Sequence, residues 1–230
     1  MRFFIVFIIF FLAIHQVFAA NEKSAVPTYK VSIDAKLYSH FIDRGLSISD
    51  KNPALNASFL FNLGPQFRFG FWGSNISNVT TSDDNFWFKF LADIKIDFNQ
   101  YSSLLIYLND DHFYKSSIRN GQSLGLKYNY ELYSMHLEWM NNYQGTHVDS
   151  EYINIGKLFA LKSSLRAGAS VGYTIQNSQG YSNYFNLKAL GIYDFNKNEL
   201  LEAGATLVSD ENQFNGRGEA ALYLAFALTY

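Results

Sequence analysis

The chain has 230 residues, a formal net charge of −2 and no cysteine. This charge excludes the strongly basic face that nucleic-acid binding requires, and the lack of cysteine excludes a fold held by disulfides. Hydrophobic residues make up 48% of the chain and aromatic residues 18%, with 22 Phe and 16 Tyr. After residue 20 they fall mainly at alternate positions, which is typical of strands whose two faces meet different surroundings.

The N-terminal segment predicts a secretory signal peptide. Arg2 supplies a positive start, Phe3 to Ile14 form an uninterrupted apolar run, and Val17-Phe18-Ala19 forms a small-x-small cleavage site. The apolar run is shorter than the roughly 20 residues that a membrane-spanning helix needs. We therefore expect residues 1–20 to be a signal peptide, residues 21–28 a short periplasmic segment, and residues 29–230 a single folded domain.

Short turn signals alternate with longer polar stretches along the rest of the chain. The short turns, such as Gly64-Pro65 and Asn196-Lys197, recur about every 33 residues, which leaves room for two strands and one longer loop. Short turns at one end and long loops at the other are typical of bacterial outer-membrane barrels. The pattern predicts an all-β fold, a transmembrane antiparallel up-and-down β-barrel of twelve strands, near 29–42, 54–63, 66–74, 85–97, 101–109, 121–129, 132–141, 150–159, 163–175, 184–195, 199–208 and 218–230.

Large apolar residues and charged residues fall on opposite faces of these strands. We expect rows such as Phe67/Phe69/Phe71 to face lipid, because a lysine or arginine there costs about 2–4 kcal/mol at mid-depth. The charged alternates are then predicted to line the lumen: Asp34, Lys36, Arg68, Lys89, Asp93, Lys95, Lys127, Glu138, Arg166, Lys188, Glu202 and Glu219. Bases outnumber acids in this set, which predicts a slight preference for anions.

Two predicted strands fit this assignment less cleanly. Lys157 falls on an apolar row, where its ammonium is tolerable if it reaches the membrane rim. Strand 101–109 is apolar on both faces, so its orientation stays open. A secreted β-sandwich is the alternative architecture, but it would need the apolar faces of two sheets to pack on one another. The uniform spacing and the bulky aromatic rows fit that arrangement poorly.

The first predicted loop and the third predicted strand carry two motifs. Residues 41–53 read Phe-Ile-Asp-Arg-Gly-Leu-Ser-Ile-Ser-Asp-Lys-Asn-Pro, and residues 70–75 read Gly-Phe-Trp-Gly-Ser-Asn. They resemble motifs of Gcw_chp, a family of proteobacterial outer-membrane proteins. The matching residues are Arg44, Gly45, Ser47, Ser49, Pro53, Gly70, Trp72, Ser74 and Asn75. The resemblance implies an outer-membrane location and architecture, and the family has no settled activity to transfer.

Arg44 and Gly45 are expected at the outer rim of the barrel. A guanidinium is a good donor to a carboxylate or carbonyl across the barrel mouth, and a glycine permits a close backbone approach. We favour a structural clasp that fixes the first loop. A ligand-contacting arginine at the pore entrance is the alternative.

The last predicted strand ends the chain on an aromatic residue. A closing strand of this kind resembles the signal that the bacterial barrel-assembly machinery reads. Its large apolar positions should face lipid, and the strand should pair with the one near 29–42 to close the barrel. The predicted assembly signal is Leu222, Leu224, Phe226, Leu228 and Tyr230.

The chain offers little for catalysis. His136 has Ser134 beside it, but both are predicted to face inward, whereas a barrel lipase or deacylase acts on lipid from its outer face. Asp110-Asp111-His112 resembles part of an outer-membrane protease site, but acidic residues in a loop are usually just solvated. No compact metal-ligand spacing occurs. We expect no enzyme and no cofactor, and a narrow porin-like channel for small solutes, with a non-conducting surface protein as the alternative. The expected partners are outer-membrane lipid, the assembly machinery during biogenesis and a small-solute ligand, and no nucleic acid.

Overall fold

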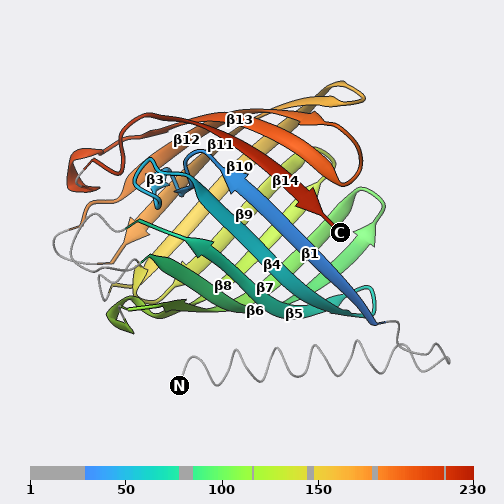
Figure 1. Ribbon diagram of the computed structural model, residues 1–230, viewed down its shortest axis with the longest axis horizontal. Helices are drawn as coiled ribbons and strands as arrows, with labels where there is room; N and C mark the ends of the chain where they lie inside the picture. Colours follow the sequence, from blue (N-terminus) through green and yellow to red (C-terminus); the bar gives the residue numbers. More distant parts are fainter. Residues whose placement is uncertain (1–28, 78–84, 116, 144–147, 178–180, 215) are drawn as a thin grey trace.

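The computed structural model describes residues 29–77, 85–115, 117–143, 148–177, 181–214 and 216–230 (Figure 1). The predicted signal peptide at 1–20 and the periplasmic segment at 21–28 lie outside these residues. None of the described helices is long and apolar enough to cross a membrane.

The long strands form one closed antiparallel barrel. β1 (Tyr29–Tyr38) pairs on one side with β4 (Ala54–Leu63) and on the other with the last strand, β14 (Ala221–Thr229). The remaining strands follow in chain order: β5 (Phe67–Asn75), β6 (Phe86–Asn99), β7 (Ser102–Phe113), β8 (Gly121–Tyr130), β9 (Tyr133–Met140), β10 (Ser150–Lys162), β11 (Leu165–Gln176), β12 (Tyr184–Asp194) and β13 (Glu199–Val208). The predicted twelve-strand up-and-down barrel is confirmed. The connections are short at one end and longer at the other (Figure 1).

Smaller elements lie in the longer connections. β2 (Ile42–Asp43) and β3 (Leu46–Ser47) form a separate two-stranded hairpin after β1. Short 3-10 turns occur at η1 (Ser117–Arg119) and η3 (Asn212–Phe214). The hairpin accounts for one difference from the predicted strands, because β1 ends at Tyr38 where the chain turns toward the hairpin and does not continue to residue 42. In another, β7 continues to Phe113, four residues beyond its predicted end.

The outer face of the barrel is apolar. Exposed aliphatic and aromatic side chains such as Phe59, Phe71, Leu187 and Leu224 alternate with inward-facing neighbours along the strands. Water would penalise this exposure by about 25 cal/mol per Å² of apolar surface. A closed antiparallel barrel with an apolar outer face is the architecture of a transmembrane barrel, in which lipid covers that face.

The structure also orients the two ambiguous strands. In β7, Tyr107 faces the lumen, so Leu104, Ile106 and Leu108 alternate onto the outer face. Lys157 lies in the outer row of β10, and its Nζ donates a 2.6 Å hydrogen bond to Tyr133 Oη at the start of β9. That tyrosine gives the ammonium a polar partner toward the short-turn end of the barrel.

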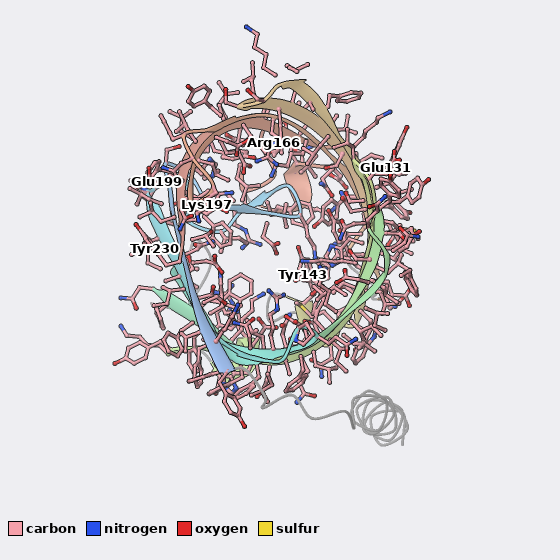
Figure 2. All side chains as sticks on the ribbon, turned by 90° about the vertical axis from the view of Figure 1, so that its right-hand side faces the viewer. Glu131, Tyr143, Arg166, Lys197, Glu199 and Tyr230 are labelled. Carbon is pink, nitrogen blue, oxygen red and sulfur yellow. The ribbon has the colours of Figure 1, made fainter. Side chains whose placement is uncertain are left out.

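The β2–β3 hairpin is folded into the barrel, where its ribbon crosses the ring of strands (Figure 2). Its turn residues Arg44 and Gly45 have φ values of 47° and 81°. Positive φ at both central positions defines a type I′ turn, which favours glycine. Leu46, on the returning strand, has 0% of its surface exposed. The predicted position of Arg44 and Gly45 at the outer rim is therefore corrected: they lie inside the barrel.

Two apolar clusters hold the hairpin at the long-loop end. One contains Phe41, Ile48, Ala54, Ile76, Trp87 and Phe113. The other contains Leu46, Met140, Tyr143, Tyr184 and Phe214. Tyr143 projects inside the ring in Figure 2. These side chains give the outer end of the barrel a small hydrophobic core, which a water-filled pore of constant width would not have.

Candidate functional site

An ion pair fixes the tip of the hairpin to the barrel wall. Arg44 Nη2 donates to Glu138 Oε2 of β9 at 2.8 Å, and Nη1 donates to Ser150 Oγ of β10 at 3.3 Å. The guanidinium also lies over the rings of Tyr143 and Tyr152, at 4.6 and 4.9 Å from their centroids. Only 3% of the Arg44 side chain and 9% of the Glu138 side chain are exposed. Burial acts to lower the pKa of Arg44, but the Glu138 carboxylate outweighs it and the pKa is raised.

The serines of the first motif hold the base of the hairpin. Ser47 Oγ lies 2.6 Å from His40 Nε2, and the Ser47 amide donates to the carbonyl of Arg217 at 2.8 Å. Ser49 Oγ accepts from the Phe41 amide at 3.0 Å and donates to the Asn52 carbonyl at 2.6 Å. These bonds satisfy polar groups that the inward fold removes from water.

The second motif packs against the first. Asn75 Nδ2 donates to the carbonyl of Pro53 at 3.0 Å, and Ser74 Oγ donates to Asn56 Oδ1 at 2.5 Å. Trp72 lies 6.1 Å from Phe41 between ring centroids. Gly70 lies in β5 between Arg68 and Trp72 on the inner face. The motif residues thus lie together around the inserted hairpin, although they are separated in sequence.

Ion pairs follow the inner wall. Arg68 binds Asp93 at 2.8 Å, Arg166 binds Asp194 at 2.6 Å, Lys89 lies 3.3 Å from Asp111, and Lys95 lies 2.9 Å from Asp97. The predicted lumenal set omitted Asp97, Asp111 and Asp194, as well as Asp43 on the hairpin. Because these acids offset the bases, the predicted excess of lumenal bases is corrected to a nearly balanced wall.

Three other predicted positions differ in their surroundings. Asp34 accepts a hydrogen bond from Ser58 Oγ at 3.1 Å. Lys127 has its ammonium 5.1 Å from the Tyr107 ring centroid, and no carboxylate in the described part of the chain forms an ion pair with it. Glu219 precedes β14 and pairs with the exposed Lys51 at 2.6 Å, so its predicted lumenal position is wrong.

One carboxylate on the wall is shared by two bases. Lys36 Nζ lies 2.6 Å from Glu202 Oε2, and Lys188 Nζ lies 3.1 Å from Glu202 Oε1. Tyr223 Oη also donates to Oε1 of this carboxylate. The Tyr223 ring can lie close to the wall because residue 204, directly opposite, is glycine, where a Cβ would come within 2.4 Å of the ring.

A cavity of about 460 Å³, lined by both polar and apolar side chains, lies beneath the hairpin. The hairpin residues Ile42 to Gly45 bound one side, and residues of β9 to β14 and Tyr38 of β1 bound the others. Lys188, Tyr223, Tyr152 and Asn154 are among the lining residues. A volume of this size accommodates a small solute.

The weak catalytic patterns are not assembled into a site. His136 Nε2 lies 2.6 Å from Tyr107 Oη, which places this histidine in a wall network across β7 and β9. Asp111 is buried against Trp87 and Lys89, whereas Asp110 and His112 occupy the alternate face of β7, where His112 stacks on Phe88. Among the described residues, no cluster of His, Asp and Glu could hold a metal ion.

The closing strand pairs with β1 as predicted. Ile33 and Tyr230 exchange two backbone hydrogen bonds of 2.8 Å. Leu222, Leu224 and Phe226 are exposed on the outer face, Leu228 is partly exposed, and Tyr223 and Ala225 are buried inside.

No family model and no curated protein matches the chain. Solved structures do match its fold. The KdgM porin, solved in complex with disordered oligogalacturonate, is 13% identical with a TM-score of 0.55, and the match covers 86% of this chain and 98% of that one. The NanC porin is 5% identical with a TM-score of 0.58, covering 87% and 99%. An outer membrane channel from Pseudomonas putida F1 is 11% identical with a TM-score of 0.53, covering 91% and 98%.

These likenesses show a shared barrel fold. Together with the apolar outer face and the asymmetry between short turns and long loops, the fold places the chain in the bacterial outer membrane.

Proposed function

We propose that this protein is a narrow outer-membrane channel for small solutes, restricted at its outer end by the β2–β3 hairpin. The observation that carries the proposal is the open cavity of about 460 Å³ inside a closed barrel. The charged, hydroxyl and amide groups in its lining, such as Lys188, Tyr223 and Asn154, can hold water and polar solutes. The interior of a small barrel can instead be filled by side chains, and here apolar side chains fill the space around the hairpin while the cavity beneath it stays open.

The wall supports weak charge selectivity in this channel. Most lumenal bases are paired with a carboxylate, so their charges largely cancel. The described wall therefore lacks the strong electrostatic potential of a single sign that would select between anions and cations. We expect similar permeability for small anions and cations, with discrimination arising from local sites.

Single-channel recording in planar bilayers tests this proposal. The wild-type protein and a Glu138→Gln variant, in which the hairpin is released, should be compared after a check that both are folded barrels. We expect small, infrequent openings for the wild type and larger ones for the variant, with a reversal potential near zero in a KCl gradient. Two folded, silent proteins would overturn the channel proposal.

The second candidate is a non-conducting surface protein whose loops bind a partner. The observation that favours it is the hydrophobic filling of the outer end. If neither the wild-type protein nor the Glu138→Gln variant conducts although both are folded, this second function is supported.

We also propose that the chain is a member of the Gcw_chp family. Supporting this proposal, the motif residues Arg44, Gly45, Ser49, Trp72 and Asn75 all surround one structural feature, the inserted hairpin. A structure of another family member with the same motifs should contain the hairpin inside its barrel, and a solvent-exposed first loop there would contradict the assignment.

A further inference from the structure

We infer that the cavity beneath the hairpin is a binding site for a small solute that carries one carboxylate and adjacent hydroxyl groups. This inference deepens the proposed function, since it names the solute class of the same lumen. It rests on a local charge imbalance and on two buried polar atoms that lack a partner.

The charge imbalance is at Glu202. Lys36 and Lys188 approach the two oxygens of this carboxylate at 2.6 and 3.1 Å. Elsewhere on the described wall, the ion pairs match one base to one acid, except where His136 lies near Glu138. One carboxylate beside two ammonium groups leaves one positive charge at this point of the wall, which a second carboxylate from a solute would neutralise. Asp43 also lines the cavity, but among the described residues it forms no ion pair with either ammonium.

Both ammonium groups are reachable from the lumen. The Lys36 side chain is 26% exposed and the Lys188 side chain 35%, whereas Glu202 is 8% exposed. Lys188 lines the cavity directly. Each ammonium has three donors, and the bond to Glu202 leaves further donors available for a solute oxygen.

The two unpartnered atoms lie beside Lys188. Asn186 is two residues from Lys188 on β12, so both face inward, and Thr206 is the direct partner of Lys188 on β13. Asn186 and Thr206 are each only 4% exposed and line the cavity. Neither Asn186 Oδ1 nor Thr206 Oγ1 has a hydrogen-bond partner among the described residues.

Buried polar atoms of this kind are normally satisfied, and an unsatisfied one costs stability. An amide oxygen needs a donor, which a solute hydroxyl supplies, and the threonine hydroxyl can donate or accept. A carboxylate held by Lys188 and Lys36 therefore places neighbouring hydroxyl groups against Asn186 and Thr206. A chloride ion would neutralise the charge but could not donate to Asn186.

Direct binding measurements test this inference independently of conduction. Gluconate is the probe, and two control compounds each lack one of its features. Sorbitol has hydroxyl groups but no carboxylate, and butyrate has a carboxylate but no hydroxyl groups. Calorimetric titration of the purified full-length mature barrel should show gluconate binding more tightly than either control.

Variants locate the site. Lys188→Gln should weaken gluconate binding at least about tenfold, since it removes a charge-assisted hydrogen bond, and Lys188→Arg should restore much of it. Lys51→Gln removes the same charge from an exposed loop pair and should leave binding unchanged. Equal binding of gluconate and sorbitol, or an unchanged affinity in Lys188→Gln, would overturn the inference. If the protein binds gluconate but does not conduct, the binding site is supported and the channel proposal fails. If it conducts but does not bind gluconate, the channel proposal is supported and the binding site fails.

Discussion

Arg44, at the turn of a two-stranded hairpin, donates a 2.8 Å hydrogen bond to Glu138 on the far side of the lumen. These residues are 94 positions apart in the sequence. The bond joins the first loop to β9 and holds the hairpin inside the barrel. The free space inside the barrel therefore depends on an ion pair as well as on the number of strands.

Breaking this pair should release the hairpin. Glu138→Gln leaves a buried guanidinium without its countercharge, a change that costs about 3–5 kcal/mol in buried pairs. The peptide bond after Arg44, protected in the wild type, should then become a trypsin site, detected by mass spectrometry of the folded protein. Glu219→Gln breaks the exposed pair with Lys51 and is the control. Equal protection in Glu138→Gln and wild type would show that the pair does not hold the hairpin.

Gly45 should tolerate no side chain. Its φ is 81°, and a Cβ would lie 2.7 Å from both Asn186 Cβ and Val208 Cγ2. Gly64 is a matched control, because its φ is 67° but a Cβ there would have no atom within 4 Å. Gly64→Ala should cost about 1 kcal/mol of unfolding free energy through backbone strain alone, and Gly45→Ala clearly more. Denaturant unfolding of both variants measures the difference, and equal losses would contradict the close packing of the hairpin tip.

Acidification should weaken the docking of the hairpin through His40. Burial lowers the pKa of this histidine, so the docked form binds fewer protons than the released form. Docking is then favoured above the ordinary histidine pKa of about 6.5 and lost progressively as the pH falls below it. Channel openings should be more frequent at pH 5 than at pH 7.5.

His40→Gln provides the control for that pH dependence. Glutamine can replace the hydrogen bond to Ser47 but cannot be protonated in this range. The variant should lose most of the increase in openings at pH 5. An unchanged increase would assign the pH effect to another group.

Removal of Tyr230 should impair closure of the barrel. The residue exchanges two hydrogen bonds with Ile33, and its side chain is 68% exposed on the surface. A chain ending at Thr229 should give less folded barrel in the outer membrane, measured by heat-modifiable mobility on gels. Tyr230→Phe keeps the backbone bonds and the ring, and should assemble normally. Normal assembly of the truncated chain would remove the terminal aromatic residue from the predicted signal.

The barrel could be predicted because its determinants are local. Alternation along segments such as Phe86 to Ile96 follows directly from lipid on one side and the lumen on the other. The pairing of β1 with β14 follows once the strands are counted, since a closed barrel has no free edge.

The inserted hairpin could not be predicted in the same way. The segment from Asp43 to Asn52 reads as a polar loop, and its burial depends on partners that are distant in sequence, including Glu138, Tyr143 and Phe214. The available signal was local: Arg44-Gly45 between Ile42 and Leu46 is a turn pair flanked by apolar residues. The charge balance of the lumen depends on strand ends in the same way. Asp111 lies beyond residue 109, where its strand was predicted to end, and Asp194 is the last residue of β12.

The conductance of a barrel without the hairpin tests the central claim most directly. Residues 42–47 should be replaced by a flexible Gly-Ser segment of equal length, and single-channel conductance compared with that of the wild type under the same salt. If the hairpin restricts the lumen, the variant should conduct several-fold more current and open more often. A folded variant with the conductance of the wild type would contradict the account.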